Sequence, residues 1–226
     1  MKTALSSQTG KSGERILRFL VVDDHAVVRR GVRGILIESF ESAEVGEAAT
    51  AAEALEQVCD KDFDAVILDV TMPGAGGLEA LKSIKLTHPN LPVLMLSIHP
   101  EDQYAVRVLK AGAAGYMTKN SVPEQLVNAV TRILDGGRYV SSVEAKQLMT
   151  YVAKGNGERP HDVLSDREFQ VLIMITSGKP VSRIADELSL SVKTISTYRS
   201  RLLDKLGLET TAELMKYGLA HELLKN

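Results

Sequence analysis

The chain has 226 residues, a length that fits one or two domains with a sizeable apolar core. Its hydrophobic (44%) and charged (25%) fractions are those of an ordinary globular protein, and a formal net charge of -2 restricts any nucleic-acid site to a local patch. No apolar run is long enough to span a membrane, and residues 1–15 are polar, so we expect a cytoplasmic protein with a disordered tail over those residues and no membrane partner.

Short apolar runs alternate with segments of helical period over about residues 16–137, which we take as the first domain. The expected strands are 17–22, 45–48, 65–68, 93–96 and 114–117, and the expected helices are 25–38, 51–60, 77–88, 101–111 and 123–136. This alternation predicts an α/β fold, a doubly wound five-stranded parallel sheet. Ser121, Pro123 and Glu124 predict a capped start for the last helix. The single cysteine, Cys59, is expected to be a core thiol.

A second, smaller domain is expected after the sheet. Residues 138–162 read as a short helix over 142–152 followed by a linker rich in Gly, Pro and charge. Residues 163–226 hold no β-rich run and show helical patterns over 166–177, 181–188, 192–206 and 211–224. Ser165 with Glu168 forms a capping box before the first of these helices, and Gly178 with Pro180 ends it. We therefore predict a small all-α domain.

Polar residues end four of the five apolar runs. Asp23 and Asp24 follow the first run, Asp69 the third, Ser97 the fourth and Lys119 the fifth. Because parallel strands end at the same edge of a sheet, where open α/β sheets bind their ligands, we expect these side chains to lie together. One Asp at a strand end is usually only a cap or turn residue, but an acid pair, an acid, a hydroxyl and a lysine at separate strand ends predict a shared site.

Carboxylates gathered in this way repel one another unless a cation or protons offset their charge. Hard oxygen ligands suit Mg²⁺, which in turn suits a phosphate ligand. Asp69 is the candidate nucleophile because it stands alone at a central strand end, before a turn through Pro73 and Gly74 that exposes it. The metal ligands are expected to be Asp23, Asp24, Asp69 and the backbone carbonyl of Thr71. Lys119 would pair with a phosphoryl oxygen.

The segments VVDDHAVVRRGV, ILDVTMPGAGGLEAL, VLMLSIH and AGAAGYMTKN resemble the receiver domain of two-component response regulators, over about residues 17–137. The resemblance implies a flavodoxin-like receiver in which Asp69 accepts a phosphoryl group from a sensor histidine kinase, with Mg²⁺ as cofactor. It also implies a switch, in which Ser97 moves toward the phosphoryl group and Tyr116 turns inward. Without the resemblance, Tyr116 would read as a half-buried aromatic residue on an edge strand.

Residues 181–200 have the length of two short helices joined by a tight turn. Apolar residues form one side of the pair and would face a shared core: Ile184, Ala185, Leu188, Val192, Ile195, Leu202, Leu203 and Leu206. The opposite side is polar and basic, as in a helix that enters a DNA major groove. The candidate DNA contacts are Lys193, Thr194, Ser196, Thr197, Arg199, Ser200, Arg201 and Lys205. Most polar helix faces are merely solvated.

The segment LSDREFQVLIMITSGKPVSRIADELSLSVKTISTYRSRLLDKLGL resembles the LuxR-type helix-turn-helix of the NarL/FixJ class, over about residues 164–208. Ser182 and Arg183 stand where Lys-Glu is frequent, and Ser196 stands where another polar or basic residue often reads DNA. These departures affect which DNA sequence is bound. The resemblance implies a phosphorylation-dependent transcription regulator that is not an enzyme, with double-stranded DNA as a partner and RNA polymerase as a further candidate.

A homodimer is expected on phosphorylation, because one small helical domain offers little surface for specific DNA binding. The last helix is the candidate dimer surface through Ala212, Leu214, Met215, Leu219 and Leu223, although the same residues would also complete the core. Two alternatives stay open. An enzyme of the haloacid dehalogenase type also uses a strand-end Asp, but it has a second Asp where this chain has Thr71. The first domain would otherwise be a protein-interaction module without phosphorylation.

Overall fold

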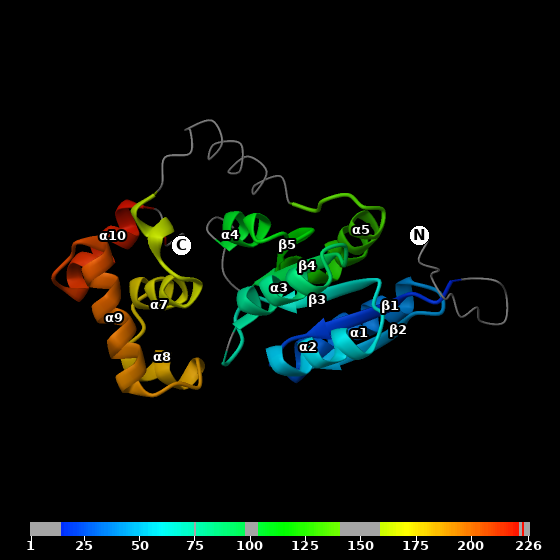
Figure 1. Ribbon diagram of the computed structural model, residues 1–226, viewed down its shortest axis with the longest axis horizontal. Coiled ribbons are helices and arrows are strands. Elements are labelled where there is room, and N and C mark those ends of the chain that lie inside the picture. The colour runs from blue at the N-terminus through cyan, green and yellow to red at the C-terminus, as the bar shows by residue number, and fades with distance from the viewer. Residues whose placement is uncertain (1–14, 75, 98–103, 141–158, 222, 224–226) are drawn as a thin grey trace.

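The computed structural model of the protein describes residues 15–74, 76–97, 104–140, 159–221 and 223. Figure 1 shows a sheet flanked by helices and, beside the α3 and α4 side of this sheet, a second group of helices. The expected tail, apart from Arg15, and the expected helix over 142–152 lie outside the described residues. None of the described helices combines the length and the apolar character needed to cross a bilayer.

The first domain is the predicted parallel five-stranded sheet, with strand order β2-β1-β3-β4-β5. Its strands are β1 (Arg18–Val22), β2 (Glu44–Ala48), β3 (Ala65–Asp69), β4 (Val93–Ser97) and β5 (Gly115–Thr118). Its helices are α1 (Ala26–Ser39), α2 (Ala51–Asp60), α3 (Gly76–Thr87), α4 (Tyr104–Lys110) and α5 (Val122–Leu134), with a 3-10 turn η1 (Lys119–Ser121) between β5 and α5. The doubly wound α/β prediction is confirmed, with β3 at the centre of the sheet.

Alternation along the strands separates two apolar layers. Phe19 and Val21 of β1 pack with residues of α1 and α5, whereas Leu20 and Val22 pack with residues of α2, α3 and α4. Successive side chains of a strand point to opposite faces, so a fully buried strand must be apolar throughout. All five residues of β3 are buried, including the carboxyl-terminal Asp69. The buried central strand therefore ends in a carboxylate side chain, that of Asp69.

The second domain consists of η2 (Pro160–Val163), α7 (Asp166–Thr176), α8 (Val181–Glu187), α9 (Val192–Leu206) and α10 (Thr211–Ala220). The Ser165 capping box is present as predicted, because the side chain of Ser165 accepts from the Glu168 amide and the Glu168 carboxylate accepts from the Ser165 amide. Gly178 then ends α7 at a φ of +82°, which a residue with a side chain rarely adopts. Helix α7 packs against α8, α9 and α10 and forms the centre of this domain.

Three local predictions are wrong. Ser121 does not cap α5, because it closes η1 in the right-handed helical region and its hydroxyl bonds Thr118 instead. Cys59 is exposed, because the buried stripe of α2 runs through Ala51, Ala54 and Val58. Val192 is 51% exposed, because it is the first residue of α9, one turn before the buried Ile195. In each case the residue type agreed with the expected role, and its position along the helix did not.

The start of α3 allows a test of the fold around Asp69. A Cβ at Gly77 would lie 1.8 Å from the carbonyl oxygen of Asp69, so the backbone itself blocks any side chain there. We expect Gly77→Ala to lower the free energy of unfolding by at least ~2 kcal/mol. In Gly31→Ala, the control in α1, the added Cβ meets nothing within 4 Å, and stability should rise by up to ~1 kcal/mol. Urea unfolding of both variants measures the difference, and equal stabilities would contradict it.

Candidate functional site

The polar residues predicted at the strand ends do converge on one edge of the sheet. Asp23 follows β1, Asp69 ends β3, Ser97 ends β4 and Lys119 follows β5. The parallel register pairs Asp69 with Leu96 and Ser97 with Thr118, which brings these ends level with one another. Asp69 and Asp23 are each 1% exposed and Ser97 is fully buried. The expected exposure of Asp69 by the turn through Pro73 and Gly74 is wrong, because Asp69 is the last residue of the fully buried strand β3.

The Lys119 ammonium lies between two buried carboxylates. Its Nζ is 2.6 Å from Asp23 Oδ2 and 2.8 Å from Asp69 Oδ2. The other carboxylate oxygens accept backbone hydrogen bonds, Asp23 Oδ1 from the His25 amide at 2.9 Å and Asp69 Oδ1 from the Thr71 amide at 3.1 Å. Lys119 therefore compensates much of the negative charge that the sheet edge would otherwise hold unpaired.

Burial and charge act in opposite directions on these groups. Burial raises the pKa of the Asp69 carboxyl to about 6, the positive charge of Lys119 lowers it, and the negative charge of Asp23 raises it. For Lys119, burial disfavours the charged form, but the attraction of Asp69 and Asp23 outweighs burial and raises the pKa of the ammonium. At neutral pH Asp69 is thus mostly ionised and Lys119 stays charged, and an ionised carboxylate is the form that can act as a nucleophile.

Asp24 lies at the rim of this site with a neighbour that the sequence prediction missed. Its side chain is 26% exposed, and His25 Nδ1 lies 2.7 Å from Asp24 Oδ1. Ligand atoms of Asp23, Asp24, His25 and Asp69 all fall within 4.8 Å of one another, a spacing that permits a shared cation. The signal for His25 was its place directly after the acid pair, where the first helix begins.

The two predicted switch residues belong to neighbouring strands. Tyr116 of β5 is 0% exposed and pairs in register with Met95 of β4. Ser97 is two residues farther along β4, at the edge that carries Asp69. The half-buried alternative for Tyr116 is wrong, because the side chain is fully enclosed. Its proposed movement stays a prediction.

The predicted DNA-binding face of the second domain is open. Lys193, Thr197, Ser200 and Arg201 are exposed, whereas Ile195 and Leu202 on the other side of α9 are buried. Ser191 caps the helix, with its side chain accepting from the Thr194 amide at 3.0 Å. Gly207 ends α9 at a φ of +65°. The helix thus has fixed ends, a buried apolar side and an exposed polar side.

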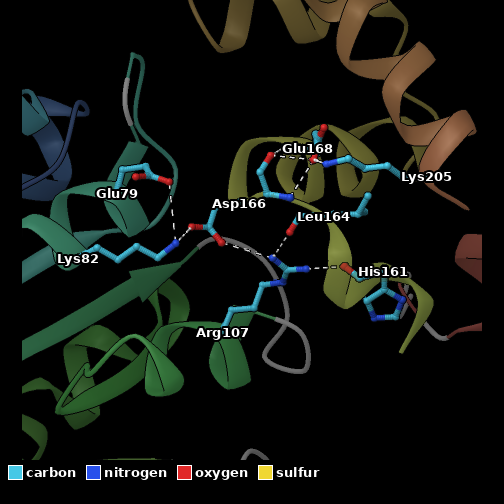
Figure 2. A network of polar contacts seen from close by, with 9 residues as sticks. Glu79, Lys82, Arg107, His161, Leu164, Asp166, Glu168 and Lys205 are labelled. Atoms are coloured by element: carbon cyan, nitrogen blue, oxygen red, sulfur yellow. Dashed lines mark hydrogen bonds and ion pairs between the residues drawn. The ribbon is translucent and has the colours of Figure 1, made fainter. Parts of the chain in front are cut away.

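Other members of the predicted DNA-contacting set are less free. Lys205 Nζ is 2.7 Å from Glu168 Oε2, within the capping box of α7 (Figure 2). Ser196 is partly buried, and its hydroxyl donates to the Val192 carbonyl at 2.9 Å. Thr194 and Arg199 are also partly buried. Any contact of these residues with DNA stays a prediction.

The predicted dimer surface divides into two sets. Leu214 and Leu223 are buried in the core of the second domain, whereas Leu219 is 67% and Met215 37% exposed on α10. Ala212 is exposed as well. The two roles considered for this helix, core and free surface, are therefore filled by different residues.

Comparison with known proteins agrees with this arrangement. The response regulator receiver domain matches residues 19–131, and the luxR family of bacterial regulatory proteins matches residues 162–217. The chain is 36% identical over 209 residues to the response regulator UvrY of Escherichia coli strain K12, covering 92% of this chain and 96% of UvrY. It is 38% identical over 211 residues to the response regulator GacA of Pseudomonas viridiflava, covering 92% and 98%.

Solved structures of response regulators also match most of this chain. The match to a structure of the RcsB response regulator of Salmonella typhimurium covers 89% of this chain and 96% of the RcsB chain, with 26% identity and a TM-score of 0.63. RcsB from Salmonella enterica serovar Typhimurium bound to promoter P1flhDC with the phosphomimetic BeF3- matches at 28% identity, with a TM-score of 0.56 and coverage of 89% and 97%. The chain therefore belongs to the NarL/FixJ class of two-component response regulators, DNA-binding regulators of transcription that depend on phosphorylation.

Proposed function

We propose that Asp69 is the phosphoryl acceptor of this regulator. The observation that carries the proposal is the buried ion pair of Asp69 with Lys119 beside Asp23, at the carboxyl end of the central strand. A carboxylate oxygen of Asp69 attacks the phosphorus of a kinase phosphohistidine, and the P–N bond breaks. The electron pair of that bond goes to the imidazole nitrogen, which takes up a proton. Lys119 stays charged and can pair with an oxygen of the transferred group.

The residues around Asp69 fit Mg²⁺ as the cofactor. Three of the four clustered side chains are carboxylates, the hard oxygen ligands that Mg²⁺ prefers, and a few protein ligands suffice because Mg²⁺ keeps several waters. Asp23, Asp24, Asp69 and the Thr71 carbonyl would hold the ion. When bound, Mg²⁺ offsets the negative charge of the phosphoryl oxygens.

The output is DNA binding through α9. Its exposed polar side has the small and basic side chains that major-groove helices use, and α10 offers Met215 and Leu219 as the surface for a second copy. We place the functional boundaries at residues 16–137 for the receiver, 138–162 for the connection and 163–226 for the DNA-binding domain. The regulator acts in the cytoplasm, without enzymatic turnover, with a sensor histidine kinase upstream and RNA polymerase as the candidate target on promoters.

Phosphorylation of Asp69 can be tested directly. Wild type incubated with acetyl phosphate and Mg²⁺ should shift on a phosphate-affinity gel, and Asp69→Asn should not shift, because an amide nitrogen cannot replace the carboxylate nucleophile. Asp62→Asn is the control, since Asp62 is exposed before the start of β3. A retained shift in Asp69→Asn would overturn the assignment of the acceptor.

The raised pKa of Asp69 makes stability depend on pH. Its ordinary pKa is about 4, so with a pKa of about 6 the folded protein binds this proton more tightly than the unfolded chain does. The tighter proton binding at Asp69 contributes fully to the free energy of unfolding below about pH 4, and this contribution is lost as pH rises through about 6.

Asp69→Asn should therefore be more stable than wild type at pH 7.5 in EDTA, by ~1–3 kcal/mol. The difference should vanish below about pH 4, where the carboxyl of wild type is protonated in both the folded and the unfolded state. Urea unfolding across this pH range measures it, with Asp62→Asn expected to track wild type. A difference that grows toward low pH would contradict burial of the Asp69 carboxylate as its cause.

The polar side of α9 predicts how DNA binding depends on salt. Lys193→Ala should weaken binding to a mixed-sequence duplex and reduce the slope of log affinity against log salt by about 1, because one phosphate contact is lost. Lys61→Ala removes another exposed lysine, in the receiver, and should leave the slope unchanged. Fluorescence anisotropy at several salt concentrations gives both slopes, and equal losses in the two variants would argue against α9 as the DNA-contacting helix.

A further inference from the structure

A polar contact centred on Arg107 joins the receiver to the DNA-binding domain (Figure 2). From α4, Arg107 Nη2 donates to the His161 carbonyl at 2.6 Å, and Nη1 donates to the Leu164 carbonyl at 3.0 Å and to Asp166 Oδ1 at 3.3 Å. Lys82 of α3 pairs with the other carboxylate oxygen of Asp166. The Arg107 side chain of the receiver thus bonds two backbone carbonyls before α7 and the carboxylate of Asp166, the first residue of α7.

An aromatic contact lies next to these bonds. The Arg107 guanidinium lies 4.1 Å from the centre of the Phe169 ring, and its side chain is only 14% exposed. Tyr104, one helical turn before Arg107, meets the same ring edge-on at 5.3 Å between centroids. Phe169 is 1% and Tyr104 3% exposed. A planar guanidinium can stack on a ring and donate in its own plane at the same time, whereas a lysine ammonium cannot.

The same tyrosine belongs to a buried apolar cluster that also contains Tyr116 of β5 and Phe169 of α7. Burial raises the pKa of the Tyr104 hydroxyl well above its ordinary value, and the neighbouring Tyr116 raises it further, as expected of two enclosed phenols near each other. Tyr116 lies on β5, three residues before Lys119. A buried cluster that includes Tyr104 therefore joins β5, the strand that leads to Lys119, to Phe169 of α7.

The DNA-binding face lies outside this contact. Helix α7, η2 and the residues between them bond α3 and α4, while Lys193, Thr197 and Ser200 of α9 are exposed to solvent. A receiver that blocked DNA by covering α9 would bury these side chains. The receiver instead restrains the DNA-binding domain through α7. This restraint leaves the polar side of α9 open but limits how the DNA-binding domains of two copies can be arranged on DNA.

We propose that Arg107 and Asp166 form an interdomain latch, which holds the unphosphorylated protein in one domain arrangement without covering α9 and which phosphorylation of Asp69 releases through Tyr104. The latch rests on the proposed function, since it gives phosphorylation a physical route to the DNA-binding domain. It restrains the domains by a few charge-assisted bonds to backbone carbonyls, which a small rearrangement of α4 breaks together.

The latch itself is tested without DNA. The exposed native Cys59 of α2 and an added Lys216→Cys in α10 carry spin labels, and pulsed electron paramagnetic resonance measures the distance between them in the full chain. We expect Arg107→Ala to broaden the distance distribution of the unphosphorylated protein, and Arg30→Ala, an exposed arginine of α1, to leave it narrow. An unchanged distribution in Arg107→Ala overturns the latch.

Its regulatory effect is tested with a duplex selected from a random-sequence pool by wild type treated with beryllofluoride. Without beryllofluoride, Arg107→Ala should bind this duplex at least ten times more tightly than wild type, whereas Arg30→Ala should match wild type. Broadened distances with unchanged affinity overturn the regulatory role. If wild type gains no affinity from beryllofluoride, the proposed function fails, and the distance measurement still decides whether the latch exists.

Asp166→Asn separates loss of the latch from loss of folding. It weakens the same contact from the other domain, so the double variant with Arg107→Ala should gain less affinity for the duplex than the sum of the two single gains in log affinity. Full additivity of the two substitutions would show that they act independently and would overturn the latch.

Discussion

The enclosure of Lys119 between Asp23 and Asp69 is the constraint on which the receiver depends. Two nearly buried carboxylates at one sheet edge would repel each other strongly in a low-dielectric interior, and one ammonium compensates them. Lys119 comes from the turn after β5, two strands away from β3 in the sheet. The charge balance of the site therefore exists only when β1, β3, β4 and β5 have come together, since Asp23, Asp69 and Lys119 come from separate strand ends.

The position of Asp69 ties the site to the core. β3 is buried along its length, and the α3 backbone approaches the Asp69 carbonyl so closely that only glycine fits at position 77. The proposed nucleophile therefore lies on a fully buried strand, and the residues proposed to respond to it lie on α4 and on β4 and β5. This division between a fixed acceptor and a responsive neighbouring face suits a switch.

The second domain is organised around α7, whose two sides have different partners. One side packs with α9 and α10, where Gly218 approaches Thr176 closely, and Phe169 faces α4 of the receiver. Because α7 provides both the core of the domain and its contact with the receiver, α9 keeps an exposed polar side. The contact between domains combines the polar bonds of Arg107 and Lys82 with the buried ring contact of Tyr104 and Phe169.

The sequence by itself determined the strand and helix order, the acidic edge and the polar side of α9. Each of these follows from local periodicity and from the rule that parallel strands end together. Helix phase and neighbours decided the exposure of Cys59 and Val192, the turn that displaced the Ser121 cap, and the division of α10 between core and surface. Only the tertiary structure brought Arg107 to His161 and Phe169. Contacts between residues more than fifty positions apart leave no period in the sequence, because their energy comes from surfaces that meet after each domain has folded.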